Sequence, residues 1–402
     1  MTRLATSWLV YRLTGSAFLL GVVGFAGQIP TFLLAPFAGV WVDRLNRRNV
    51  LLVTQILAML QSLGLAALTL AHHINIHEII ALSVFQGLIN AFDMPGRQTF
   101  LVEMVEEKED LGNAIALNSS MVNLARLLGP SLAGAVIAIS GEGYCFLIDG
   151  VSYLAVILSL ALMHVKPAQI KRSADSMLVQ LREGWTYVSG SSAIRTILLL
   201  FALVSLMGWP FTVLMPIFAL DVLHGGAHTQ GFLMGAVGVG ALISAISLAV
   251  RKTVLGLGRM VPISTAAFGF GLIGFGLSRY FWLSLALMLV CGFGMMQQMA
   301  ASNTIIQTVV EDSKRGRVMS FYTVAFVGMA PFGSLLAGAL AHAIGAPYTV
   351  IFSGACCLAG AGWFAARLPG IRDWIRPIYR DLGILPPADP PVNAVIQDSV
   401  GR

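Results

Sequence analysis

Long apolar runs separated by short polar loops dominate this sequence. Eleven runs are long enough to cross a membrane, because a spanning helix takes about 20 residues. They cover approximately 17–42, 50–71, 78–97, 114–140, 144–164, 194–220, 230–250, 260–278, 282–303, 318–343 and 348–366. Only 11% of the 402 residues are charged and 57% are hydrophobic, whereas soluble chains carry about 25% charged residues. There is too little charge to coat soluble domains, so we predict an all-α membrane protein.

A shorter apolar run, 4–13, precedes these eleven. At 1.5 Å per residue it spans about half of a bilayer core. With it the chain has twelve helices. We predict that the first helix is truncated at its N-terminus, because the start was placed too far downstream or because the chain is a fragment.

The basic residues follow the positive-inside rule. With twelve helices and both chain ends in the cytoplasm, 21 of the 25 Lys and Arg residues fall on the cytoplasmic side. Arg12 and Arg279 fall outside, and Arg3 and Arg126 fall within helices. This bias predicts a cytoplasmic C-terminus, and it accounts for the net charge of +6 without a nucleic-acid partner.

The chain divides into two halves around a polar segment. We predict an N-terminal bundle over 1–164, a cytoplasmic linker over 165–193, a C-terminal bundle over 194–367 and a cytoplasmic tail over 368–402. Within the linker four apolar residues share one helical face, which predicts an amphipathic helix at the membrane surface; they are Leu178, Leu181, Trp185 and Val188.

An internal repeat supports the two halves. Gly129–Ala135 resembles Gly333–Ala339, at an offset of 204 residues. The two segments fall on the fifth and eleventh helices, which are equivalent in two halves of six. Parallel repeats of six helices are a transporter architecture.

The loop after the second helix carries the strongest local motif. It reads Gly39-Val-Trp-Val-Asp43-Arg44-Leu-Asn-Arg47-Arg48. It resembles the signature G-x-x-x-D-R-x-G-R-R of the major facilitator superfamily, with Asn46 in place of the inner glycine. Asn tolerates positive φ well, so we expect the turn to be kept. A plain positive-inside loop is the alternative, but such a loop needs no Asp. The resemblance implies a cytoplasmic gate in which Asp43 meets the N-terminus of the eleventh helix.

A second motif lies on the fifth helix, around Gly129, Pro130 and Gly134. It resembles the superfamily's antiporter motif g-x-x-x-G-P-x-x-G-G, with alanines at two glycine positions. The resemblance implies an exporter. The alternative is an ordinary small-residue packing face with a proline kink.

Further strings resemble one branch of the superfamily, which contains enterobactin-type siderophore exporters and macrolide or multidrug efflux proteins. They are Leu13–Ser16, Asp93–Gln98, Asn113–Asn118 and Arg315–Ser320. The resemblance covers nearly the whole chain. It implies two six-helix bundles in a bacterial cytoplasmic (inner) membrane and proton-coupled efflux of a small amphipathic substrate. One departure is Ser83, where the family carries an arginine tied to proton coupling.

Ionisable residues within membrane segments are costly and are candidates for function. Arg126 lies near mid-bilayer, where it could bind substrate, couple protons or pair structurally. Asp149 could titrate during transport or reach toward the interface. A third set lies near the inner face and fits a gate or hinge; it comprises Asp93, Pro95, Arg97, Arg315 and Arg317.

No enzymatic or cofactor motif stands out. No Walker-type ATP site is present, and His73 and His77 have no third metal ligand in view. We therefore expect a transporter that uses no cofactor and no metal. Two alternatives remain: an importer of a small nutrient on the same fold, and a membrane scaffold that has lost transport because its first helix is truncated.

Overall fold

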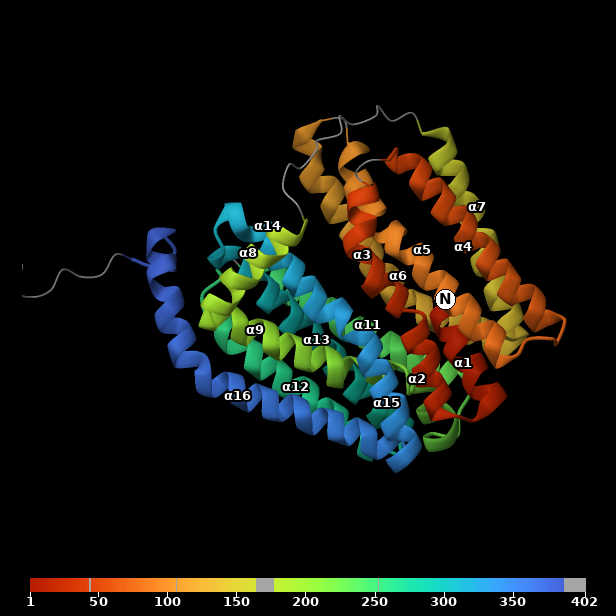
Figure 1. Ribbon diagram of the computed structural model, residues 1–402. Helices are drawn as coiled ribbons and strands as arrows, with labels where there is room; N and C mark the ends of the chain where they lie inside the picture. Colours follow the sequence, from red (N-terminus) through yellow and green to blue (C-terminus); the bar gives the residue numbers. More distant parts are fainter. Residues whose placement is uncertain (43–44, 106, 164–176, 252, 387–402) are drawn as a thin grey trace, which may run out of the picture.

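The computed structural model describes residues 1–42, 45–105, 107–163, 177–251 and 253–386 (Figure 1). These residues form helices joined by short turns. In the first part of the chain the helices are α1 (Thr2–Thr14), α2 (Ala17–Ala26), α3 (Ile29–Val42), α4 (Arg47–Leu70), α5 (Ile76–Glu103), α6 (Leu111–Ser140) and α7 (Glu142–Leu162). Then α8 (Met177–Gly190) leads into the second part.

The second part repeats this plan with more irregular turns. Its helices are α9 (Ser192–Leu203), α10 (Met215–Ile217), α11 (Ala227–Ala249), α12 (Leu257–Leu277), α13 (Phe281–Val309), α14 (Asp312–Thr323), α15 (Ala330–Ile344) and α16 (Ala346–Asp381). Wider π-helical turns interrupt two of its spans, at Val204–Gly208 and Val324–Gly328.

The eleven expected spans are confirmed. Eleven helical stretches among the described residues are long and apolar enough to cross a membrane. One span joins α2 to α3, one runs from α9 to the turn after α10, and one joins α14 to α15. We call the end that carries most Lys and Arg residues the inner end, and the opposite one the outer end.

The helices pack as two groups. In the first, α4 packs against α5 and α7, and α3 packs against α5; in the second, α12 packs against α13 and α16, and α11 packs against α13. Two pairs join the groups, α6 with α11 and α2 with α15. In Figure 1 the red-to-yellow group lies on the right and the green-to-blue group on the left. The expected arrangement in two helix bundles is thereby confirmed.

Helix α1 is short but well packed. It has 13 residues, about 20 Å of helix, and it contacts α2, α5, α6, α7 and α10. Leu4, Ala5, Trp8, Leu9, Val10 and Tyr11 are buried. That the helix is truncated stays a prediction.

One local expectation needs correction. Asn46 has φ −68° and ψ 110°, so it does not supply the positive φ expected of it. Instead its side chain caps α4 and accepts a hydrogen bond from the Asn49 backbone N–H at 3.2 Å, which satisfies an otherwise free N–H of the first turn. The last helix also continues past Arg367, through Pro369 and Pro377, to Asp381.

The extension of α16 has a packing reason. Ile371, Ile375 and Tyr379 recur at four-residue spacing and are all buried, so one face of the extension joins the core. Each proline removes one helical hydrogen bond, and this burial offsets the loss. The helix therefore occupies part of the segment that we expected to be a tail.

A helix, α8, occupies part of the expected linker, and that it is amphipathic at the membrane surface stays a prediction. Val188 is buried and Trp185 is exposed, so they do not share one buried face. The side chains of Leu178 and Leu181 lie outside the described residues. Gly184 packs against α14, since a Cβ there would lie 2.8 Å from the Phe321 ring. The helix therefore rests on α14.

Candidate functional site: a cleft between the two helix groups

Helices α6 and α11 touch along their outer halves. A Cβ on Gly134 would lie 2.9 Å from the Gly231 Cα, and one on Gly238 would lie 2.9 Å from the Leu127 Cα. Such distances require glycine, because real Cβ atoms do not approach so closely. We call this close helix contact a seam. Within the antiporter-type motif, Gly134 lies in the seam, and the Pro130 carbonyl faces it, 2.8 Å from the position of a Cβ on Gly231. Gly129 lies outside the seam, because a Cβ there would meet nothing within 4 Å.

Helices α2 and α15 form an equivalent seam. A Cβ on Gly21 would lie 2.8 Å from the Gly338 Cα, and further inward one on Gly328 would lie 2.8 Å from the Phe32 ring. Gly338 is the repeat counterpart of Gly134, at the offset of 204 residues. Both copies of the repeat thus place a glycine against the opposite helix group.

Both seams end partway through the molecule. Inward of Leu127, nearly every residue of α6 from Gly112 to Arg126 is exposed, on all faces of the helix. Inward of Phe32, the side chains of Phe37 and Trp41 are 57% and 59% exposed. A helix exposed all round borders open space on its interior side as well as on its lipid side. We call this space, between the groups and inward of Leu127 and Phe32, the inner cleft.

Arg126 lies at the closed end of the inner cleft. Its backbone contacts α11, since a Cβ on Gly238 would lie 3.1 Å from the Arg126 carbonyl oxygen, but its side chain is exposed. Asp149 lies on α7, where it accepts a hydrogen bond from the Thr2 hydroxyl at 2.6 Å. The single proton of the Ser62 hydroxyl is shared between Asp149, at 3.3 Å, and the Phe146 carbonyl, at 3.0 Å. The two candidate charges therefore do not form a pair.

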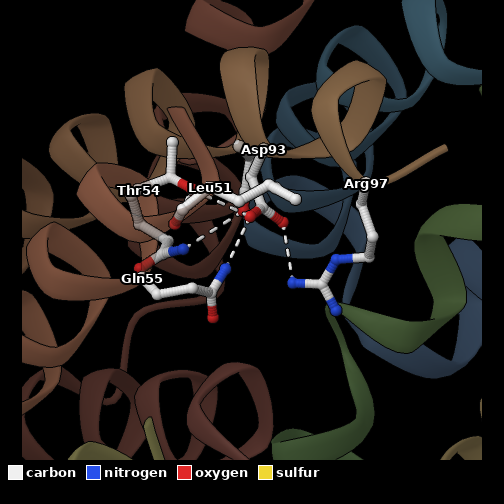
Figure 2. A network of polar contacts seen from close by, with 7 residues as sticks. Leu51, Thr54, Gln55, Asp93 and Arg97 are labelled. Atoms are coloured by element: carbon white, nitrogen blue, oxygen red, sulfur yellow. Dashed lines mark hydrogen bonds and ion pairs between the residues drawn. The ribbon is translucent and has the colours of Figure 1, made fainter. Parts of the chain in front are cut away.

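Asp93 joins α4 to α5 through a buried network (Figure 2). Its Oδ1 accepts from the Gln55 amide at 2.6 Å and from the Thr54 hydroxyl at 3.1 Å, and its Oδ2 pairs with Arg97 at 2.9 Å. The Thr54 hydroxyl also lies 2.9 Å from the Leu51 carbonyl, so its single proton is shared. Pro95 lies one turn before Thr99, whose hydroxyl donates to the Pro95 carbonyl at 2.9 Å. The helix continues through this proline.

The gate motif is described only in part. Asp43 and Arg44 lie outside the described residues, so their contact with the eleventh span stays a prediction. Arg47 pairs with Glu103 at the inner end of α5. Arg48 donates to the carbonyls of Leu160 and Ala161, at 2.6 and 2.5 Å, and so binds the last turn of α7. Free carbonyls at a helix C-terminus favour such a cation. Gly39 lies in α3, where a Cβ would meet nothing within 4 Å.

Arg315 and Arg317 lie on α14, near α8. A Cβ on Gly184 of α8 would lie 3.3 Å from the Arg317 Cβ. A pocket of about 640 Å³ opens there at the inner surface, and Tyr187, Lys314, Arg317 and Trp374 are among its lining residues. Partial burial raises the pKa of the Tyr187 phenol, and the charge of Glu311 adds to the rise. This pocket lies away from the seams.

The outer end carries contacts that the sequence did not reveal. The Tyr11 hydroxyl donates to Asp221 across the two helix groups, and the Gln230 amide donates to the Ser7 hydroxyl at 3.1 Å. Arg12 pairs with the buried Glu142 at 2.9 Å. The partners are far apart in sequence, so no local pattern connects them. The only sequence signal for these contacts was an acidic residue next to the outer end of an apolar run. Together these contacts tie α1 to both groups.

A family described as "Transmembrane secretion effector" has a sequence model that matches residues 1–374. The chain belongs to this family. It is 26% identical to the staphyloferrin A transporter of Staphylococcus aureus, over 85% of this chain and 86% of that protein. It is also 26% identical to the multidrug efflux pump Tap of Mycolicibacterium fortuitum, over 93% and 92%.

The fold agrees with this family. A solved D-xylose–proton symporter superposes with a TM-score of 0.69 at 14% identity, covering 90% of this chain and 93% of that one. This likeness shows the shared fold, and the family match over residues 1–374 confirms the resemblance to the major facilitator superfamily. As a member of this transmembrane secretion effector family, the chain is a multi-pass membrane transporter of small molecules.

Proposed function

We propose that this protein is a secondary active transporter that exports a small amphipathic molecule, a siderophore or a drug, by alternating access. The observation that carries the proposal is the inner cleft, closed at its outer end by two glycine seams and open at its inner end. An exporter needs such a state to load its substrate from the cytoplasm. The name of one relative, the multidrug efflux pump Tap, supports this direction.

The mechanism follows from the two seams. Substrate enters the inner cleft, the two helix groups rock about the bound molecule, and the seams open while the inner ends close. Binding drives this change only to the extent that the substrate prefers one state over the other. In the closed inner state Asp43 would contact the start of the eleventh span, where a helix N-terminus stabilises a carboxylate by about 0.3–1 kcal/mol.

Protons are the proposed driving ion, and the cytoplasmic membrane is the proposed location, with the inner end and the C-terminus in the cytoplasm. The absence of the usual fourth-helix arginine, with Ser83 at that position, means that coupling must use other groups. Asp149 is the first candidate because it lies within a span and its carboxylate has hydroxyl donors.

Transport in inside-out membrane vesicles tests the proposal. Vesicles that contain the protein are energised with a respiratory substrate, and uptake of erythromycin, ethidium and a citrate-type siderophore is followed with and without a protonophore. We expect uptake of at least one compound, and we expect the protonophore to abolish it. Asp43→Asn should lower this uptake while membrane abundance is unchanged.

Two results would contradict export. Uptake confined to right-side-out vesicles would identify an importer of a small nutrient. No uptake in either orientation, by protein that reaches the membrane, would favour the scaffold alternative.

A further inference from the structure

Two arginines lie at similar depth beside the closed end of the inner cleft. Arg126 is 14 residues from the outer end of α6, and Arg3 is 11 residues from the outer end of α1. At 1.5 Å per residue these are depths of about 21 and 16 Å. The hydrocarbon core is about 30 Å thick, so both guanidinium groups lie near its middle.

The two arginines lie on adjacent helices. Helices α1 and α6 pack against each other, and the two positions lie at similar depth along them. Both side chains remain exposed. Like charges thus lie on packed helices in a region where even one charge is costly.

Neither arginine has an acidic partner among the described residues. Thr2 directly precedes Arg3 in the chain, but the Asp149 carboxylate is contacted by the Thr2 and Ser62 hydroxyls and not by Arg3. Asp93, on α5, pairs with Arg97. Two cations without an anion, facing open space, form an incomplete site for a negatively charged group.

We propose that Arg3 and Arg126 together bind the carboxylate of the transported molecule in the inner cleft. Guanidinium groups suit this role because they stay charged and present paired N–H donors that match a carboxylate. Exposed apolar side chains of α3, such as Phe37 and Trp41, would contact the rest of an amphipathic molecule. The inference rests on the proposed function and narrows its substrate class to anionic amphipaths.

The test uses two dyes that share a xanthene ring and differ in charge. Carboxyfluorescein is anionic and tetramethylrhodamine ethyl ester is cationic. Binding of each to the full purified chain in nanodiscs is measured by fluorescence polarisation. We expect the wild type to prefer carboxyfluorescein, and each of Arg3→Gln and Arg126→Gln to weaken its binding by about tenfold, the scale of one lost charge-assisted hydrogen bond.

Three variants separate charge from structure. Arg126→Lys keeps the charge and should retain most of the affinity for carboxyfluorescein. Arg126→Glu should reverse the preference toward the cationic dye. Arg279→Gln removes an exposed arginine of the outer end and should change neither affinity. Thermal unfolding midpoints confirm that each variant is folded.

The outcomes also distinguish this inference from the proposed function. Failure of the wild type to bind carboxyfluorescein, or equal binding by wild type and the Arg3→Gln, Arg126→Gln double variant, overturns the anion site. Arginine-dependent binding without vesicle transport supports the site and removes export. A third outcome is active transport of the cationic dye at the same rate in the wild type and in both arginine variants, with no binding of the anionic dye. This result supports export and overturns the site.

Discussion

Gly134 of α6 and Gly231 of α11 approach so closely that a Cβ on the first would lie 2.9 Å from the Cα of the second and 2.7 Å from the Ala227 carbonyl oxygen. Gly338 of α15 makes the equivalent approach to Gly21 of α2, where a Cβ would lie 2.6 Å from the Gly21 Cα. The repeated motif thus builds a pair of seams. Backbone on both sides leaves no flexible side chain to move aside.

Substitution at this seam should open the outer end. Gly134→Ala forces α6 and α11 apart, and overpacking of this kind costs about 1–3 kcal/mol. Because the contact joins opposite helix groups, this free-energy cost destabilises the state in which the outer end is closed. A cysteine introduced at Ser7, in a chain whose four cysteines are replaced by alanine, should react faster with an impermeant maleimide added from outside.

The control is Gly129→Ala on the same helix. A Cβ there meets nothing within 4 Å, and alanine favours a helix interior by about 0.5–1 kcal/mol over glycine. We expect unchanged labelling and an equal or higher unfolding midpoint. Equal labelling rates for the two variants would contradict the seam as the site of outer closure.

The hydrogen bond between Tyr11 and Asp221 predicts a second, milder effect on the same equilibrium. Tyr11→Phe removes only the hydroxyl, and Asp221→Asn removes only the charge. Because Asp221 is exposed, we expect about 0.5–1.5 kcal/mol of coupling, the range of an ordinary hydrogen bond and below that of most bonds to charged groups. Maleimide labelling at position 7 should rise in each variant.

A double-mutant cycle tests that coupling. The variant with both changes should label little faster than either single variant. Strictly additive effects would mean that the two residues act independently and that the hydrogen bond does not hold the outer end closed.

The sequence predicted what depends on local hydrophobicity. All eleven spans follow from apolar runs, because the free energy of transfer into lipid is summed along one helix. The small residues around Gly134 were interpreted as an antiporter-type motif, with a packing face as the alternative. The sequence did not identify the partner helix, because helix pairing depends on how each helix is rotated about its axis.

Long-range polar pairs escaped prediction for the same reason. Thr2 and Asp149 are 147 residues apart, and Tyr11 and Asp221 are 210 apart. No spacing rule connects such positions. The role of Asn46 was misjudged because asparagine favours both positive φ and the N-cap, and the start of α4 uses the second property.

The Asp93 network predicts unequal effects of its two charged residues. Asp93 is buried and accepts from three side chains, whereas the Arg97 side chain is 64% exposed. Asp93→Asn loses the charged acceptor and should cost about 1–3 kcal/mol. Arg97→Gln should cost less than about 1 kcal/mol, because water replaces an exposed partner.

Thermal unfolding followed by tryptophan fluorescence measures both variants in the same detergent. Gln55→Leu is the matched test of the shortest bond in the network, 2.6 Å to Asp93, and should lie closer to Asp93→Asn. If Arg97→Gln lowers the midpoint as much as Asp93→Asn, the ion pair and not the amide contact stabilises the carboxylate.

The pair of Arg12 and Glu142 predicts an asymmetry between its partners. The Glu142 side chain is 5% exposed and that of Arg12 is 54% exposed. Arg12→Gln leaves a buried carboxylate without its cation, which costs about 1–3 kcal/mol or more. Glu142→Gln leaves an arginine that water already solvates, so its cost should be smaller. The double variant should recover stability relative to Arg12→Gln, because no uncompensated charge stays buried. Thermal unfolding midpoints of the three variants test this prediction. A lower midpoint for Glu142→Gln than for Arg12→Gln would mean that Glu142 contributes through packing and not through its charge.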